Sequence, residues 1–158
     1  MTKPIPDGFH TLTPHIIVSG PEAMDFYKKA FGAQELMRQT MPDGKGLMHG
    51  RMTIGDSVMM LAGEFPPHCM TPKSRGGASV TLSLYVDDVD AWADRAVKAG
   101  CKAIMPVTDM FWGDRYTVLE DPYGHSWSIA THKHDYTPEQ MAEAAKAAFA
   151  KGGCGEQK

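Results

Sequence analysis

The chain has 158 residues, of which 42% are hydrophobic and 22% are charged, and its formal net charge at pH 7 is −3. This length is typical of one globular domain with a buried core. The slightly negative charge and the lack of a basic cluster argue against a nucleic-acid partner. The N-terminus lacks the apolar segment of a signal peptide, and no apolar run approaches the length that spans a bilayer. We therefore expect a cytoplasmic protein with no membrane partner.

The cysteine content agrees with this expectation. The chain has three cysteines, Cys69, Cys101 and Cys154, and no two of them form a Cys-x-x-Cys pair. Secreted domains held by disulfides usually carry an even number of cysteines, and zinc knuckles need paired ones. Neither a disulfide framework nor a zinc knuckle is expected.

In chain order, the first half predicts a strand, a helix and three further strands. Residues 15–18 form a short β-rich run, and Pro21 then suits the first position of a helix. Gly32 stands where a left-handed C-terminal cap is expected, after an apolar stripe of Ala23, Phe26, Tyr27, Ala30 and Phe31. Turn sequences Pro-Asp-Gly and Gly-Asp separate three predicted strands at residues 34–40, 47–54 and 57–62.

The second half predicts the same order of elements. A strand over residues 80–86 precedes a helix that is capped by Asp87 or Asp88 and ends at Gly100. The turn Asp121-Pro122-Tyr123-Gly124 leads into the last of three strands, which are predicted at residues 102–106, 115–119 and 126–131. A final helix over about residues 137–150 begins with the capping-box sequence Thr137-Pro138-Glu139-Gln140.

The two halves are related by a fixed offset of 68 residues. The offset takes Val18 to Val86, Ala23 to Ala91, Gly32 to Gly100, Leu61 to Ile129 and Ala62 to Ala130. A period of this length indicates one supersecondary unit used twice. The predicted fold is therefore α+β, one domain of two tandem βαβββ modules that form a cupped mixed sheet around a cavity. Module 1 covers about residues 9–65, a linker about 66–79, and module 2 about 80–132.

Three segments inside these modules carry a family resemblance. The helix sequence Phe26-Tyr27-Lys28-Lys29-Ala30-Phe31-Gly32-Ala33, the turn Ile54-Gly55-Asp56-Ser57 and the hairpin Asp121-Pro122-Tyr123-Gly124-His125 resemble the vicinal oxygen chelate superfamily. That superfamily holds glyoxalase I, extradiol dioxygenases, fosfomycin resistance proteins and bleomycin-binding proteins. Residues 111–116 and 130–133 are similar to its PhnB-like, glyoxalase-related branch. The resemblance implies cupped sheets with helices on the convex side and a cavity between them, and it implies a homodimer.

The strand patterns give independent support for a concave, polar face. Thr81, Ser83 and Tyr85 alternate with apolar residues, as do Ser126 and Ser128 in the last strand. The large apolar residues are expected to face the helix, so the small polar ones are left for the cavity. A merely solvent-exposed face remains the alternative interpretation.

The resemblance also indicates where a metal would be held. Metal-dependent members place His, Gln or Glu at positions that correspond to Thr13, Met60, Thr81 and Ser128 here, and the repeat agrees because 13 + 68 = 81 and 60 + 68 = 128. Hydroxyl and thioether groups are poor ligands for these divalent metals. We therefore expect no metal and no cofactor. A slip of two residues would place His15 at the first position, with Ser83 as its repeat mate.

Several histidines are candidates for function. His15 shares a strand face with Thr13 and is expected to point into the cavity, where a neutral imidazole can donate, accept or act as a base. A structural role is the alternative for His15, and His49 is a weaker candidate. His132 and His134, beside Asp135, have the spacing to clamp a metal on one strand face, although solvated polar residues at a strand end are the favoured interpretation.

A second candidate group is formed by Trp112, Arg115 and Tyr116. Aromatic rings and a guanidinium at the edge of a cavity can hold a flat or anionic ligand. The alternative is a loop anchored by a buried Trp112 and an ion pair between Asp114 and Arg115. The chain is also rich in methionine, and two roles are open for these residues. They suit an adaptable apolar lining of the cavity, and the alternative is simple core filling; the residues include Met48, Met52, Met59 and Met60.

Three functions compete on this basis. The first is a metal-free small-molecule-binding protein similar to the bleomycin-resistance type, with ligand contacts from His15, Met60, Thr81, Ser83, Trp112, Arg115 and Ser128. The second is a metal-dependent lyase, isomerase or dioxygenase of the same superfamily. The third is a non-catalytic dimeric module with a closed cavity. The absence of metal ligands at the expected positions favours the first.

Overall fold

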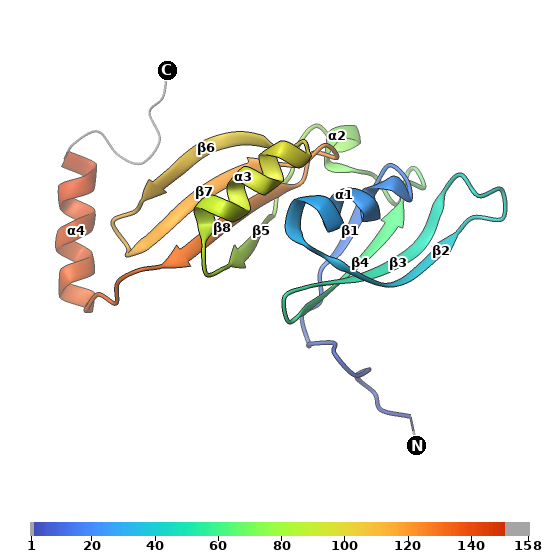
Figure 1. Ribbon diagram of the computed structural model, residues 1–158, viewed down its shortest axis with the longest axis horizontal. Coiled ribbons are helices and arrows are strands. Elements are labelled where there is room, and N and C mark those ends of the chain that lie inside the picture. The colour runs from blue at the N-terminus through green and yellow to red at the C-terminus, as the bar shows by residue number, and fades with distance from the viewer. Residues whose placement is uncertain (1, 151–158) are drawn as a thin grey trace.

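The chain folds into two modules that repeat one arrangement of a helix and a four-stranded sheet (Figure 1). The computed structural model describes residues 2–150, so Cys154 lies outside the described residues. Both modules have the predicted order βαβββ, and an additional helix follows the second. The predicted α+β class is confirmed.

Module 1 consists of one helix and a mixed sheet. Its sheet has the order β1-β4-β3-β2, with β1 parallel to β4 and the other pairs antiparallel. The elements are β1 (His15–Val18), α1 (Glu22–Phe31), β2 (Gln34–Thr40), β3 (Leu47–Ile54) and β4 (Ser57–Gly63).

Module 2 repeats this plan with the order β5-β8-β7-β6. Its elements are β5 (Thr81–Tyr85), α3 (Val89–Ala99), β6 (Lys102–Asp109), β7 (Asp114–Glu120) and β8 (Ser126–His132). Strand β6 extends beyond the predicted end at residue 106, because Thr108 and Asp109 still pair with β7. The linker also holds a short helix that the sequence analysis did not predict, α2 (Pro72–Arg75), whose first turn is capped by Thr71 accepting a hydrogen bond from the backbone N–H of Ser74.

The helices bury the apolar stripes that the sequence predicted. Helix α1 buries Tyr27 and Phe31, and the Phe31 ring centroid lies 4.6 Å from that of Trp127 in β8. Gly32 ends α1 with a φ of 64°, which confirms the predicted left-handed cap, and Gly100 ends α3 as predicted, also with a positive φ, 124°. The core therefore lies between the helices and the convex faces of the sheets.

The two modules are joined through their helices and through one buried carboxylate. Helices α1 and α3 pack against each other, and Arg95 Nε of α3 donates to the carbonyl oxygen of Ala30 at 3.0 Å. Tyr27 Oη of α1 donates to Asp121 Oδ2 of the β7–β8 turn at 2.6 Å. His125 Nε2, just after that turn, lies 2.8 Å from the carbonyl oxygen of Ile17 in β1.

These contacts between the modules set the relative position of the two sheets. Figure 1 shows the two sheets side by side rather than face to face. Since the helices pack together on the convex side, the concave faces of one chain stay open, and Tyr85 of β5 is 69% exposed. Residues of both modules, among them Met59 and Leu82, also line one cavity of about 480 Å³.

The last helix, α4 (Pro138–Ala150), stands at the far end of module 2 (Figure 1). It begins with the predicted capping box, in which Gln140 Oε1 accepts from the backbone N–H of Thr137 at 2.9 Å. None of its described residues is buried, and its aromatic contact with the body is Phe149 against Phe111 at a centroid distance of 6.0 Å. Within residues 2–150, no helix has the length and apolar character needed to cross a membrane.

Candidate functional site

The strand register places two pairs of residues at equivalent points of the two concave faces. His15 of β1 lies opposite Met60 of β4, and Ser83 of β5 lies opposite Ser128 of β8. The offset of 68 residues relates both pairs, because 15 + 68 = 83 and 60 + 68 = 128. His15 and Ser83, rather than Thr13 and Thr81, are the strand partners of Met60 and Ser128. This pairing favours the two-residue slip that the sequence left open.

The hydroxyl groups on the second concave face bond mainly to one another. Ser128 Oγ donates to Ser83 Oγ at 2.7 Å, and Thr81 Oγ1 lies 3.1 Å from Ser126 Oγ. In module 1, Thr13 Oγ1 donates to the carbonyl oxygen of His10 at 2.8 Å. These groups are therefore satisfied by neutral partners rather than by charged ones.

The same positions do not fit a divalent metal. Of the four paired residues, His15 offers an imidazole nitrogen, but Met60 offers a thioether and Ser83 and Ser128 offer hydroxyls, which such metals bind poorly. Across residues 2–150, no group of three or more His, Cys, Asp or Glu side chains has the geometry of a metal site. One imidazole does not make up the three or four ligands of a divalent-metal site.

His15 has a second histidine as its neighbour. The rings of His15 and His49 meet edge to face with a centroid distance of 5.8 Å, so β1 and β3 bring them together across β4. Partial burial lowers the pKa of His15, and the positive charge of His49 lowers it further. The lowered pKa favours the neutral ring, which can donate one hydrogen bond and accept another.

A polar cluster centred on Asp114 lies at the far end of the second concave face. The Asp114 carboxylate is 5% exposed and accepts from Tyr85 Oη at 2.9 Å, Trp112 Nε1 at 3.1 Å and His132 Nδ1 at 2.8 Å. Burial alone would raise the pKa of Asp114, but hydrogen bonds from these three donors outweigh it and lower the pKa. Trp112 is fixed further by Tyr116, at a centroid distance of 5.5 Å.

Arg115 is not brought to this cluster. Its Nε and Nη2 donate to the two carboxylate oxygens of Asp90 in α3 at 2.7 and 2.8 Å, and its Nη1 donates to Asp109 at 3.1 Å. Successive residues of a strand point to opposite faces, so Arg115 lies toward the helix while Asp114 lies on the concave side. The alternative of an Asp114–Arg115 ion pair is therefore wrong, because each side chain has other partners.

The remaining histidine and methionine candidates lie in different surroundings in the structure. His132 is held between Asp114 and Asp135, with Nε2 3.0 Å from Asp135 Oδ1, whereas His134 packs against Tyr136 at a centroid distance of 6.2 Å. The two histidines thus do not form a clamp. Core filling is confirmed for Met52 and Met59, which are buried, while Met48 is 43% exposed and Met60 is partly exposed.

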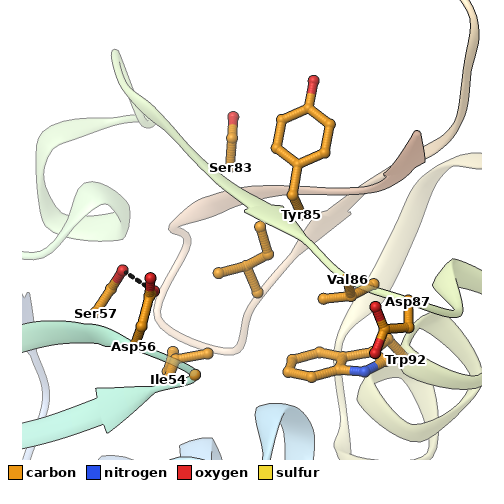
Figure 2. A pocket seen from close by; sticks show the side chains of 10 residues that line it. Ile54, Asp56, Ser57, Ser83, Tyr85, Val86, Asp87 and Trp92 are labelled. Carbon is orange, nitrogen blue, oxygen red and sulfur yellow. Dashed lines mark hydrogen bonds between the residues drawn. The ribbon is translucent and has the colours of Figure 1, made fainter.

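An open cleft of about 480 Å³ lies between β5 and the turn that joins β3 to β4. Figure 2 shows that Ser83 and Tyr85 project to one side of β5, whereas Val86 and Trp92 lie on the other side with Ile54. Asp56 accepts a hydrogen bond from Ser57 Oγ at 2.9 Å at the cleft wall. Strand β5 therefore divides the polar concave face from the apolar helix side.

Sequence reasoning placed Tyr85 on the concave face without giving it a role, and it did not place Arg51 or Asp114 there. Arg51 of β3 lies opposite Met60, in the same row as His15. The alternation in β3, where Gly50, Met52 and Ile54 are buried and the residues between them are less buried, was the available signal for Arg51. Asp114 had no such signal, since two of its three donors, Tyr85 and His132, lie far from it in the sequence.

Comparison with known proteins agrees with this architecture. The chain is 42% identical over 138 residues to the uncharacterized protein Rv0887c of Mycobacterium tuberculosis, and the match covers 84% of this chain and 81% of that protein. The structure of TioX from Micromonospora sp. ML1 is 25% identical, with a TM-score of 0.62 over 78% of this chain and 98% of that one.

Two further structures show the same fold at lower identity. TnmS3, described as an antibiotic binding protein from Streptomyces sp. CB03234, is 22% identical with a TM-score of 0.54, covering 78% of this chain and 98% of that one. The PhnB protein from Bacillus cereus is 17% identical with a TM-score of 0.60, covering 77% and 99%. Residues 15–129 match the family described as the Glyoxalase/Bleomycin resistance protein/Dioxygenase superfamily. The chain belongs to this superfamily.

Proposed function

We propose that the protein is a metal-free small-molecule-binding protein of the glyoxalase/bleomycin-resistance type, within the PhnB-like branch. The observation that supports this most directly is the pairing of His15 with Met60 and of Ser83 with Ser128 at equivalent points of the two concave faces. These groups offer hydrogen bonds and a polarizable thioether, which suit an organic ligand better than a divalent cation.

The proposed ligand contacts come from both modules. His15 and Met60 supply them in module 1, and the hydroxyls of Thr81, Ser83 and Ser128 supply them in module 2. Trp112, held by Asp114, provides an aromatic surface at the edge. Arg115 is left out, since two carboxylates neutralise it on the helix side. The fold of TnmS3, an antibiotic binding protein, is consistent with this class of function.

The proposal predicts that purified protein carries no stoichiometric Ni, Zn, Mn or Fe and binds small aromatic compounds on its concave faces. Elemental analysis measures the metal, and backbone amide NMR shifts during titration with benzyl alcohol and phenylphosphonate locate the binding.

His15→Ala is expected to weaken binding about tenfold, because a hydrogen bond and a ring contact are lost. His68→Ala, in the exposed linker between the modules, is the matched control. A metal at full occupancy, lost together with an enzymatic activity in His15→Ala, would favour the metal-dependent lyase, isomerase or dioxygenase instead.

We also propose that the protein is a cytoplasmic homodimer without a nucleic-acid or membrane partner. Both concave faces are open in one chain, and exposed apolar side chains border them, including Leu12 at 88% and Val80 at 66% exposure. A second copy of the chain would cover these open sheets and the apolar side chains that border them.

Sedimentation equilibrium at micromolar concentration is therefore expected to give twice the chain mass of 17.3 kDa. Val80→Asp should shift the protein to monomer, because an unpaired charge would be buried at the interface. Val97→Asp, on the exposed side of α3, should leave the dimer intact. A wild-type protein that sediments only as a monomer would contradict the proposal.

A further inference from the structure

Arg51 differs from the other arginines of the chain in what its guanidinium contacts. Its Nη2 donates to the sulfur of Met37 at 3.3 Å, and its Nε is buried without a hydrogen-bond partner. Its guanidinium carbon lies 5.9 Å from the centroid of the Phe9 ring. The others each donate to a carboxylate or carbonyl oxygen, namely Arg38, Arg75, Arg95 and Arg115.

This arrangement leaves a positive charge poorly compensated. A thioether is a weak acceptor, and a buried N–H of a charged group loses its hydration without replacement. Ion pairs among residues 2–150 do not include Arg51. Buried unsatisfied donors are few in native proteins, and a guanidinium in this state is suited to bind an anionic oxygen.

Two histidines lie near Arg51 on the same face of the first sheet, where they offer hydrogen bonds to a ligand. Met60 separates Arg51 from His15 in one row across β3, β4 and β1, and His49 lies two residues from Arg51 on the same strand. The pKa of His15 is lowered by partial burial and by the charge of His49, and no carboxylate contributes to raise it. The acidic side chains of α1 and β2 that form ion pairs, Asp25 and Glu35, pair with Arg38 and Lys28 instead.

We infer that the concave face of the first sheet binds the acidic group of an organic anion, with Arg51 as its main contact and His15 and His49 beside it. The inference rests on the proposed small-molecule function and names the ligand class. A planar guanidinium binds the two oxygens of a carboxylate or phosphonate. The apolar or aromatic body of the anion lies against Met37, Met60 and Phe9, whose surfaces a bare inorganic ion would leave uncovered.

The test compares phenylphosphonate, inorganic phosphate and uncharged benzyl alcohol as ligands of the full-length protein as purified. Calorimetric titration is expected to show phenylphosphonate binding more tightly than either of the other two. In nitrogen-15 spectra, the Nε–H signal of Arg51 should shift with phenylphosphonate. Arg51→Met, which keeps an apolar stem, should weaken this binding by about tenfold or more, as loss of a charged hydrogen bond does. Arg115→Met, which removes an arginine that pairs with Asp90 on the helix side of module 2, should change it less than about twofold.

Each outcome decides a different point. Equal binding of phenylphosphonate by wild type and Arg51→Met, or binding by wild type without a shift of the Arg51 signal, overturns the inference. Binding of benzyl alcohol on the concave face without binding of phenylphosphonate also overturns it but leaves the proposed function standing. If no probe of either charge binds, the proposed function fails as well. Should Arg51→Met fail to fold, Arg51→Lys is the second variant, since it keeps the positive charge but lacks the two parallel N–H donors of a guanidinium. An unchanged affinity in Arg51→Lys would count against the contact of Arg51 with both oxygens of the anion.

Discussion

Replacing Asp121 by alanine is expected to lower the free energy of unfolding by about 3–5 kcal/mol. The Asp121 carboxylate is 2% exposed and accepts four hydrogen bonds. Two come from the side chains of Tyr27 and Trp127, and two from backbone N–H groups in its own turn, those of Tyr123 and His125. Alanine would leave all four donors without an acceptor, two of them in the core.

Urea unfolding followed by tryptophan fluorescence and circular dichroism measures this loss. Tyr27→Phe removes one donor of the set and should lower the free energy of unfolding by about 1 kcal/mol. Asp56→Ala is the matched control, since Asp56 is exposed and accepts only from the neighbouring Ser57, and its effect should stay within about 0.5 kcal/mol. An Asp121→Ala protein as stable as the Asp56→Ala protein would show that the buried carboxylate does not hold the two modules together.

The second large effect is expected at Asp114. Asp114→Ala should lower the free energy of unfolding by about 2–3 kcal/mol, because Tyr85, Trp112 and His132 all lose their acceptor. The indole of Trp112 should also become more mobile, which its fluorescence anisotropy reports. Asp109→Ala is the control. Asp109 is an exposed carboxylate at the end of β6, and its partner Arg115 would still form an ion pair with Asp90 after the substitution.

The same carboxylate gives stability a defined pH dependence. Hydrogen bonds to Asp114 and then to Asp135 raise the pKa of His132 above its ordinary value of 6.5. Because the pKa of His132 is higher in the folded state than in the unfolded state, the protonated ring stabilises the fold. This contribution is fully present below pH 6.5 and is lost as the pH rises through the folded pKa. Asp114 behaves in the opposite way: its folded pKa is lowered, so its contribution is present above pH 3.8 and is lost as the pH falls through the lower folded value.

NMR titration of the His132 ring tests the neutral part of this range. In Asp114→Asn the pKa of His132 should return most of the way to 6.5, and the loss of stability above that pH should largely disappear. Asp135→Asn should have a smaller effect, since Asp135 is fully exposed and solvent screens its interaction. A His132 pKa unaffected by Asp114→Asn would rule out the pairing as its cause.

The sequence predicted the elements well because their signals are local. Strand alternation, helix stripes and the caps at Gly32 and Gly100 depend on residues a few positions apart, and the 68-residue repeat supported each half by the other. Register was less accessible: alternation shows that Thr13 and His15 share a face, but only the pairing of β1 with β4 decides which of them lies opposite Met60.

The candidate site could be predicted only in part for a related reason. Trp112 and Arg115 are close in the sequence, yet β7 directs Arg115 to the helix side, where it pairs with Asp90 of a different element. The Asp114 cluster and the row of Arg51, Met60 and His15 join segments that are distant in the chain. No local pattern specifies such contacts, so they follow from the tertiary arrangement alone.

The two equivalent pairs on the concave faces have diverged into different chemistry. His15 and Met60 offer an imidazole and a soft sulfur, whereas Ser83 and Ser128 offer two hydroxyls already bonded to each other. The scaffold is nearly symmetric, but one concave face carries an imidazole beside a thioether and the other carries two paired hydroxyls. The repeat has therefore kept the backbone positions of the two pairs and changed their side-chain chemistry.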